Sequence, residues 1–277
     1  MRRVAIQGVE GSYHAVAAGK YYGEGVEVEG CLTFKEVVRS VKSGRVDSGL
    51  MAIENTIAGS LLQNHELLRG SEVWVSGEMK MRISHSLVAL AGTGIGELKE
   101  VWSHPIALAQ CMEYLDKLEG VRLVETEDTA LSAREIAEGR RGGVGALCSR
   151  LTGEKLGLSI LAEGIETNTH NFTRFLVLEG ESLGEAERRE SNKASLVFSL
   201  PHSSGSLSAV LSILSYYGMS LTKIQSLPII GREWEYLFYI DLTYKDYGRY
   251  GQSLEAIKPL ISDFRILGEY KEGEVYA

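Results

Sequence analysis

The stretch HNFTRFLVL, residues 170–178, joins a polar start to an apolar end. Its tail, Phe175 to Leu178, is a run of large apolar side chains that predicts a buried strand. Asn171, Thr173 and Arg174 precede this run, and such groups are costly to bury unless they find partners. Because successive side chains of a strand point to opposite faces, Thr173 and Arg174 are expected on opposite sides of a sheet.

Upstream of this strand, short apolar runs alternate with segments of helical period, which is typical of an α/β protein. The expected elements of the first lobe are strands at 4–8 and 48–55 and helices at 12–22 and 34–43. Residues 72–90 are predicted to be extended chain that crosses into a second lobe, where the strand–helix rhythm continues through residue 158. We therefore expect residues 1–179 to form two α/β lobes that face each other across a cleft, a usual place for small-ligand sites.

The last third of the chain has a different pattern. Residues 180–193 are almost wholly polar and predict a linker. Residues 194–277 then follow the order βαββαβ, which is the ferredoxin-like arrangement.

The composition limits the classes of partner. The 277 residues carry a net charge of −8 without a Lys/Arg block, which argues against nucleic acid and anionic membranes as partners. No run approaches the roughly 18 apolar residues that span a bilayer, and the first residues contain too few apolar side chains for a signal peptide. Three widely spaced cysteines, an odd number, indicate reduced thiols in a cytoplasmic protein.

Two polar pairs follow predicted strands. Ser103 precedes Pro105 at a predicted helix start, and Gln110, seven residues further on, is expected on the same helical face. The alternative is a capping serine with a solvated glutamine. Glu54 and Asn55 end the strand at 48–55, and ligands of open α/β sheets bind beyond the carboxyl ends of strands. The alternative there is turn chemistry, with Asn55 as a helix cap.

Other signals are weaker or point away from cofactors. The turn at Gly11 and Ser12 offers backbone N–H groups at a helix start, which suits an anion. The six histidines show no metal-binding spacing, so we expect no zinc. The sequence contains no nucleophile elbow, P-loop or dinucleotide fingerprint, so acyl transfer, nucleotide hydrolysis and hydride transfer have no support.

The combination of these stretches resembles a known family. GVEGSYHAVAA, MAIENTIAGSLLQNHELL, ISHSLVAL, SHPIALAQC, GALCSRLTGEKLGLSILAEGIE and NFTRFLVL occur in the order seen in prephenate dehydratases. The segment from Lys193 to Leu242 resembles the ACT regulatory domain that follows the catalytic part in that family. The resemblance implies a two-lobed α/β catalytic domain similar to a periplasmic-binding-protein fold, with a ferredoxin-like ACT domain behind it.

The resemblance also implies a reaction and its residues. Prephenate would be converted to phenylpyruvate with loss of carbon dioxide and water, without cofactor or metal. Thr173 would assist departure of the ring hydroxyl. The other residues that match the catalytic set are Glu54, Asn55, Ser103, Gln110 and Glu127. The residues expected to bind substrate are Gly11, Ser12, Arg174 and Phe175.

In the second domain, the resemblance implies an effector site for L-phenylalanine between paired ACT domains. The expected effector residues are Gly205, Ser206, Leu207, Gln225, Ser226, Leu227 and Pro228. Gln225-Ser226-Leu227-Pro228 departs from the family pattern Glu-Ser-Arg-Pro, and Ser204-Gly205-Ser206-Leu207 departs from Pro-Gly-Ala-Leu. These departures leave the strength and the identity of the effector open. The intact helix and strand pattern predicts self-association through this domain, as a dimer or a tetramer.

Two other functions remain open from the sequence. Arogenate dehydratase differs only in an amino group of the substrate, and no residue decides between the two enzymes. A non-catalytic two-lobed sensor joined to an ACT domain is the alternative from a different class. Thr173 together with the segments Ile53-Glu54-Asn55 and Ser103-His104-Pro105 favours an enzyme, because a sensor needs no leaving-group donor.

Overall fold

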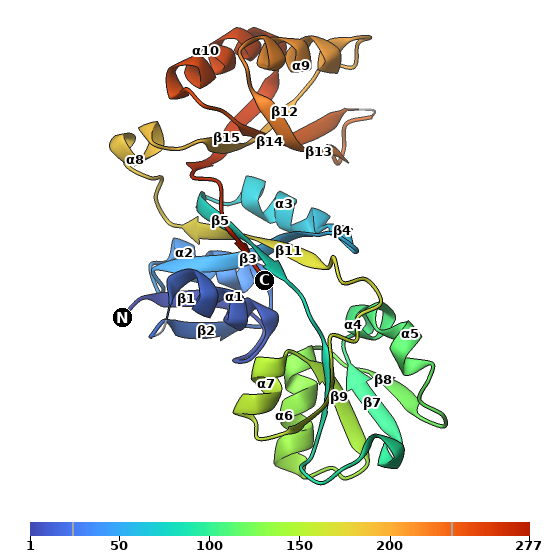
Figure 1. The fold of residues 1–277 in the computed structure, drawn as a ribbon. Coiled ribbons are helices and arrows are strands. Elements are labelled where there is room, and N and C mark those ends of the chain that lie inside the picture. The colour runs from blue at the N-terminus through green and yellow to red at the C-terminus, as the bar shows by residue number, and fades with distance from the viewer. Residues whose placement is uncertain (24, 234) are drawn as a thin grey trace.

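The computed structural model describes residues 1–23, 25–233 and 235–277, whose strands form three sheets (Figure 1). Two sheets belong to the two lobes and the third to a C-terminal domain. The first lobe contains strands β1 (Arg3–Gln7), β2 (Glu27–Cys31), β3 (Ser48–Asn55), β4 (Gly59–Ser60), β5 (Trp74–Arg82), β11 (Phe172–Glu179) and β16 (Val275–Tyr276). Its helices are α1 (Tyr13–Tyr22), α2 (Phe34–Lys42) and α3 (Leu62–Gly70).

The first-lobe sheet has the order β16-β5-β11-β3-β1-β2, with β4 paired to β3. β11 lies in its centre and pairs antiparallel with both β3 and β5. The predicted burial of the apolar tail is confirmed, since Phe175 to Leu178 are all nearly inaccessible to solvent. The predicted strand at 48–55 is also confirmed, with the same bounds.

The second lobe is a five-stranded sheet of order β10-β6-β9-β7-β8. Its elements are β6 (Ser86–Ala89), β7 (Glu100–Ser103), β8 (Arg122–Glu125), β9 (Val144–Cys148), β10 (Ser159–Glu163), α4 (Pro105–Gln110), α5 (Met112–Leu115), α6 (Thr129–Gly139), α7 (Arg150–Lys155) and the 3-10 turn η1 (Ile95–Glu97). The chain passes between the lobes twice, at 83–85 after β5 and at 164–171 before β11 (Figure 1). The predicted crossing within 72–90 is therefore confirmed.

The C-terminal domain has the predicted βαββαβ order. Its elements are β12 (Lys193–Ser199), α9 (Ser206–Tyr216), β13 (Ser220–Pro228), β14 (Tyr236–Thr243), α10 (Tyr247–Ile257), η2 (Lys258–Leu260) and β15 (Ser262–Tyr270). The antiparallel sheet has the order β13-β14-β12-β15, and α9 and α10 cover one face of it (Figure 1). The predicted linker contains a short helix, α8 (Glu185–Arg189).

The other face of this sheet packs on the first lobe. Val197, Tyr239 and Leu267 of the C-terminal sheet share one apolar cluster with Val75 and Leu178 of the first lobe. We call this cluster the interdomain core. Since burial of apolar area is the main stabilising term of a fold, the interdomain core contributes to the stability of both domains.

Residues 271–277 do not stay with the C-terminal domain, to which the sequence assigned them. They return to the first lobe, where Val275 and Tyr276 of β16 pair parallel with Lys80 and Met81 of β5. The approach is so close that a Cβ atom on Gly273 would collide with the carbonyl group of Glu78, so only glycine fits. The sheet of the first lobe is thus completed by the last described strand of the chain.

Candidate active site

Two consecutive residue pairs, or rungs, of the β3–β11 ladder place Thr173 and Arg174 on opposite faces of the sheet. Thr173 pairs with Asn55 on one rung, and Arg174 pairs with Glu54 on the next. The predicted alternation is confirmed, because Thr173 lines the cleft between the lobes whereas Arg174 contacts the C-terminal domain. We call these the Thr173–Asn55 rung and the Arg174–Glu54 rung.

The cleft contains an open cavity of about 210 Å³ lined by residues of both lobes. The volume is below the usual range of roughly 300 to 1,000 Å³ for drug-sized ligands, so the cavity suits a compact molecule. The lining residues expected from the sequence are Ser12, Asn55, Gln110, Thr173 and Phe175.

The hydrogen bonds of Asn55 define the direction of the Thr173 hydroxyl. The Asn55 side-chain oxygen accepts from the backbone N–H groups of Ile57 at 2.9 Å and Ala58 at 2.8 Å, so its NH2 group must point the other way. This group donates to Oγ1 of Thr173 at 3.0 Å and to the side-chain oxygen of Asn171 at 2.7 Å. Because the Thr173 oxygen accepts from Asn55, its own hydrogen is left to donate into the cavity.

Gln110 is oriented in the same way. Its Oε1 atom accepts from Nδ2 of Asn171 at 3.0 Å and lies 2.9 Å from Nε2 of His85. Burial lowers the pKa of His85, against smaller upward effects of Gln110 and Glu166, so His85 is neutral near pH 7. A neutral His85 protonated at Nε2 donates to Gln110 and accepts from the Tyr13 hydroxyl at 2.8 Å. The NH2 group of Gln110 therefore remains available to a ligand.

Asn171 joins these two groups and was not among the predicted site residues. It is fully buried, accepts from Asn55 and donates to Gln110. A polar residue just before a buried strand was the signal that could have found it. His85 and Tyr13 were also missed, because their roles depend on contacts between residues that are distant in sequence. His85 contacts Gln110, 25 residues away, and Tyr13 contacts His85, 72 residues away.

Three residues expected to line the cleft lie outside the cavity, namely Ser103 and Glu127, predicted as catalytic, and Gly11, predicted to bind substrate. Ser103 is completely buried at the end of β7 and donates to the carbonyl of Leu147 at 2.9 Å, so its expected pairing with Gln110 is wrong. His104 caps α4 instead. Glu127 is exposed and does not line the cavity. Gly11 does not line it either, and its carbonyl accepts from the hydroxyl of Thr152 in the second lobe.

The Arg174–Glu54 rung corrects two further expectations. Neither side chain reaches the cavity, since strand alternation places both on the opposite face of the sheet. Arg174 forms ion pairs with Glu78 and Asp241, and Glu54 forms one with Lys223 at 2.9 Å. Arg174 is therefore not a substrate ligand, and Glu54 is not a catalytic carboxylate.

The electrostatics of the cavity limit how it can hold an anion. No lysine or arginine is found among the described residues that line it, and Asp128 is its carboxylate. Asp128 caps α6 by accepting from the N–H groups of Ala130 and Leu131. Ser12 lines the cavity and caps α1, whose first N–H groups have no partner within the helix. The amino end of α1 and neutral donors are thus the available partners for a carboxylate.

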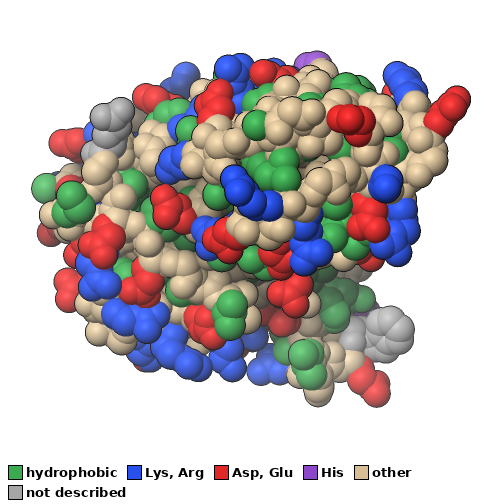
Figure 2. All heavy atoms as spheres, turned by 90° about the horizontal axis from the view of Figure 1, so that it is seen from below, with side chains coloured by type: hydrophobic (Ala, Val, Ile, Leu, Met, Phe, Trp, Pro, Cys, Tyr) green, Lys and Arg blue, Asp and Glu red, His purple; other side chains and the backbone are tan. Residues whose placement is uncertain are grey.

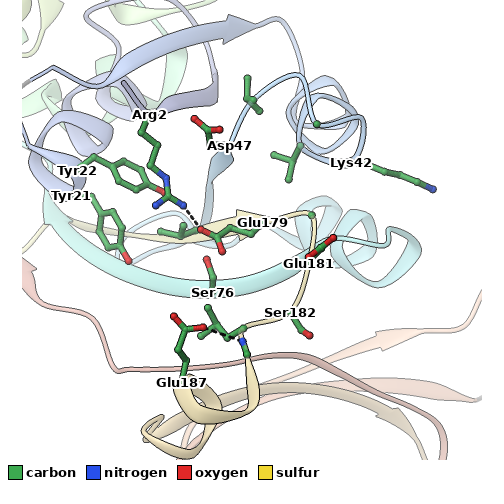
Figure 3. A pocket seen from close by; sticks show the side chains of 17 residues that line it. Arg2, Tyr21, Tyr22, Lys42, Asp47, Ser76, Glu179, Glu181, Ser182 and Glu187 are labelled. Carbon is green, nitrogen blue, oxygen red and sulfur yellow. Dashed lines mark hydrogen bonds and ion pairs between the residues drawn. The ribbon is translucent and has the colours of Figure 1, made fainter.

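A second hollow, of about 830 Å³, lies between the first lobe and the segment 179–187 (Figure 3). Arg2 there donates to Glu179 and stacks over the ring of Tyr22. The carboxylates around it are those of Asp47, Glu179, Glu181 and Glu187. It contains none of the expected site residues, and its excess of negative charge disfavours an anionic ligand.

Neither a metal site nor a membrane-spanning helix is found in the part of the chain that the structure describes. Within 1–23, 25–233 and 235–277, no group of three or more His, Cys, Asp or Glu side chains could hold a metal ion. No described helix has the length and apolar character needed to cross a bilayer. On the face shown in Figure 2, positive and negative side chains are interspersed, unlike the continuous basic patch of a nucleic-acid-binding surface.

Changing Asn55 to aspartate should disable the orientation of Thr173. An ionised aspartate only accepts hydrogen bonds, so Thr173 would donate to it and lose its free hydrogen. We expect kcat to fall by about 10² or more, the lower range for loss of a positioned donor. Steady-state kinetics would measure this, with the exposed Asn168→Asp as control. Equal rates for the two variants would contradict the assigned direction of the hydroxyl.

His14 should make the fold sensitive to acid. Burial lowers its pKa from 6.5 to about 4, so the unfolded chain binds a proton more readily than the fold does. The stability that His14 contributes is present above pH 6.5 and is lost as the pH falls toward 4, by at most about 3 kcal/mol. We expect His14→Gln to flatten the pH dependence of urea unfolding in this window. The exposed His202→Gln should leave that dependence unchanged.

A small cavity with an oriented hydroxyl donor is suited to an enzyme that helps an oxygen atom leave a bound molecule. The comparisons identify which such enzymes this chain resembles. The family described as prephenate dehydratase matches residues 4–182. The chain belongs to the prephenate dehydratase family.

Relatives extend the similarity beyond these residues. A bifunctional chorismate mutase/prephenate dehydratase of Aquifex aeolicus is 32% identical over 97% of this chain and 73% of its own length. Arogenate dehydratase 2 of Petunia hybrida is 35% identical, over 97% of this chain and 71% of its own length.

Solved structures agree with the fold. A prephenate dehydratase from Arthrobacter aurescens in complex with L-Phe is 25% identical, with a TM-score of 0.87 over 98% of this chain and 90% of that one. A structure titled GqqA, a quorum-quenching acylase, is 26% identical, with a TM-score of 0.89 over 98% of both chains.

Proposed function

We propose that this protein is a prephenate dehydratase that converts prephenate to phenylpyruvate, carbon dioxide and water. The observation that carries the proposal is the Thr173 hydroxyl, which accepts from Asn55 and keeps its hydrogen for a ligand in the cavity. In the reaction, the bond between ring and carboxylate carbon breaks and its electrons enter the ring. The ring carbon–oxygen bond breaks at the other end, and the ring becomes aromatic.

Thr173 donates a hydrogen bond to the departing oxygen. A threonine hydroxyl is too weak an acid to ionise freely near pH 7, so its proton moves only as that oxygen becomes basic. Water leaves, and the hydroxyl recovers a proton from solvent. No nucleophile is needed, because aromatisation makes the products stable. A positioned donor of this kind contributes about 10² to 10⁴ in rate, and orientation contributes more.

The apolar wall of the cavity suits the ring of the substrate. Phe175 follows Thr173 by two residues and therefore lies on the same face of β11. The His14 ring meets Phe175 edge to face, at 5.1 Å between ring centres. The carboxylates of the substrate would bind at the amino end of α1, beside Ser12, and to the NH2 group of Gln110.

We propose that the C-terminal domain is an ACT domain that binds phenylalanine and pairs with a second copy. Its sheet topology and the L-Phe named in the related Arthrobacter structure support this. Ser199 and Leu227 both pair with Leu237, so the segments that begin α9 and end β13 lie at the same end of the sheet. The edge strand β13 exposes Ile224 by 46%, an apolar side chain available to a partner.

Three buried free cysteines support a cytoplasmic location.

Arogenate is the second candidate substrate, and one observation favours it. Asp128 places a carboxylate in a cavity whose described lining residues include no lysine or arginine, where it would pair with the ammonium group that arogenate carries in place of the keto group of prephenate. Relatives named arogenate dehydratase fit this alternative. Acyl transfer has no such support, since no hydrogen bond joins a histidine ring to a serine or threonine hydroxyl among the described residues.

The test is turnover by the purified chain. Prephenate should yield phenylpyruvate, measured by its absorbance in alkali, faster than the spontaneous conversion in buffer. Arogenate is assayed in parallel for phenylalanine, and Asp128→Asn should raise the ratio of kcat/KM for prephenate to that for arogenate. Binding of prephenate by calorimetry without turnover of either compound would contradict the enzyme and favour the sensor.

A further inference from the structure

We infer that Arg174, Glu54 and Lys223 are positioning residues through which the C-terminal sheet holds Thr173 and Asn55 in catalytic geometry. The inference rests on the proposed function and adds a route for its regulation. The Arg174–Glu54 rung is the neighbour of the Thr173–Asn55 rung and faces the opposite way. A displacement of the Arg174–Glu54 rung therefore reaches the Thr173–Asn55 rung through a single backbone step on each strand.

Arg174 connects β11 to two strands of the C-terminal sheet. It donates to Asp241 of β14 and, at 3.1 Å, to the hydroxyl of Tyr270 of β15. Its third contact, at 2.6 Å, is to Glu78 of β5. All of these side chains are nearly inaccessible to solvent, so the guanidinium has no water to replace a lost partner.

Glu54 connects β3 to a third strand of that sheet. Lys223 of β13 lies 2.9 Å from Glu54 and donates at 2.7 Å to Ser60 of β4. The Lys223 side chain is only 7% exposed, so its ammonium depends on these contacts. The same strand continues into the expected effector segment, whose first residue, Gln225, follows two positions later.

The ladder is irregular next to these contacts. Between the pairs Arg174–Glu54 and Phe175–Ala52, the register of β3 and β11 shifts by one residue, at Ile53. Such bulges interrupt the ladder and re-aim neighbouring side chains. The polar rungs are therefore separated from the regular part of the sheet, and contacts from the C-terminal domain help to define their position.

The decisive variant is Lys223→Gln, which removes the charge in the C-terminal domain and touches no residue of the cavity. We expect kcat for prephenate to fall and the phenylalanine concentration for half-inhibition to shift, each by about fivefold or more, the lower range of allosteric coupling. KM should change by less than about twofold, because positioning acts on the transition state. The matched control is Lys271→Gln, whose exposed pair with Glu190 lies in the same half of the chain.

A charge exchange separates coupling from packing. The double variant Glu54→Lys with Lys223→Glu restores the ion pair, so it should recover kcat and inhibition relative to either single change. Wild-type turnover in the same assays tests the proposed function separately. Wild-type-like kcat and inhibition in Lys223→Gln would overturn the inference. Lowered stability with no recovery in the folded double variant would also overturn it, since the pair would then be only structural.

Discussion

Replacing Thr173 by valine is expected to reduce kcat by about 10² to 10⁴ while the protein keeps its fold. Valine has nearly the same shape, so the strand and the 1% exposed Phe175 two residues on should remain in place. The loss is specific to the hydrogen that Thr173 offers to the departing oxygen. Since this bond strengthens in the transition state, KM should change far less than kcat.

Steady-state kinetics with prephenate and circular dichroism of both proteins measure this result. Thr173→Ser keeps the hydroxyl and should recover most of the rate. Thr167→Val, at an exposed threonine of the connecting segment, serves as control. Near-normal turnover by Thr173→Val would remove the assigned donor, and with it the proposed mechanism.

The second large effect concerns stability and Glu78. Its carboxylate is 1% exposed and pairs with Arg174 at 2.6 Å and Lys193 at 2.7 Å. Glu78→Gln would remove the carboxylate that two buried cations share, leaving Arg174 with Asp241 alone and Lys193 with Glu272 at 3.6 Å. Breaking a buried ion pair in this way typically costs about 3 to 5 kcal/mol. Urea unfolding at pH 7 should show this loss, whereas Glu190→Gln, in an exposed pair with Lys271, should cost less than about 1 kcal/mol.

The same carboxylate gives a pH signature. Burial raises the pKa of Glu78, but Arg174 and Lys193 outweigh this and lower the pKa below its usual value of 4.5. The unfolded chain therefore takes up the proton first, so this contribution is complete above about pH 4.5 and is lost as the pH falls further. Glu78→Gln should remove that acid limb. An unchanged limb, or a loss below 1 kcal/mol at pH 7, would show that water or a shift of the chain relieves the two cations.

Local pattern in the sequence was enough for much of the fold. The alternation along β11 correctly separated Thr173 from Arg174, because strand geometry has a period of two whatever the surroundings. The same rule, applied to β3, would have separated Glu54 from Asn55, but both were placed in the site because motif similarity groups neighbours in sequence. The predicted pairing of Ser103 with Gln110 is wrong because Ser103 is the last residue of β7 and not part of α4, so the helical period does not apply to it.

Contacts between distant segments could not be predicted in this way. Arg174 and Asp241 are 67 residues apart, and nothing local indicates that they meet. Such contacts supply the partners that the buried polar groups of residues 170–178 need. Asn171 is satisfied by Asn55 and Gln110, Thr173 by Asn55, and Arg174 by carboxylates of two domains.

The return of β16 to the first lobe has a consequence for biosynthesis. Gly273 and Glu78, which meet beside this strand, are 195 residues apart, so the pairing of β16 with β5 cannot form while the ribosome is still making the C-terminal half. Closing so long a loop also slows folding. The edge strand β16 therefore joins the sheet only after the C-terminal domain, which lies between β11 and β16 in sequence, has been synthesised.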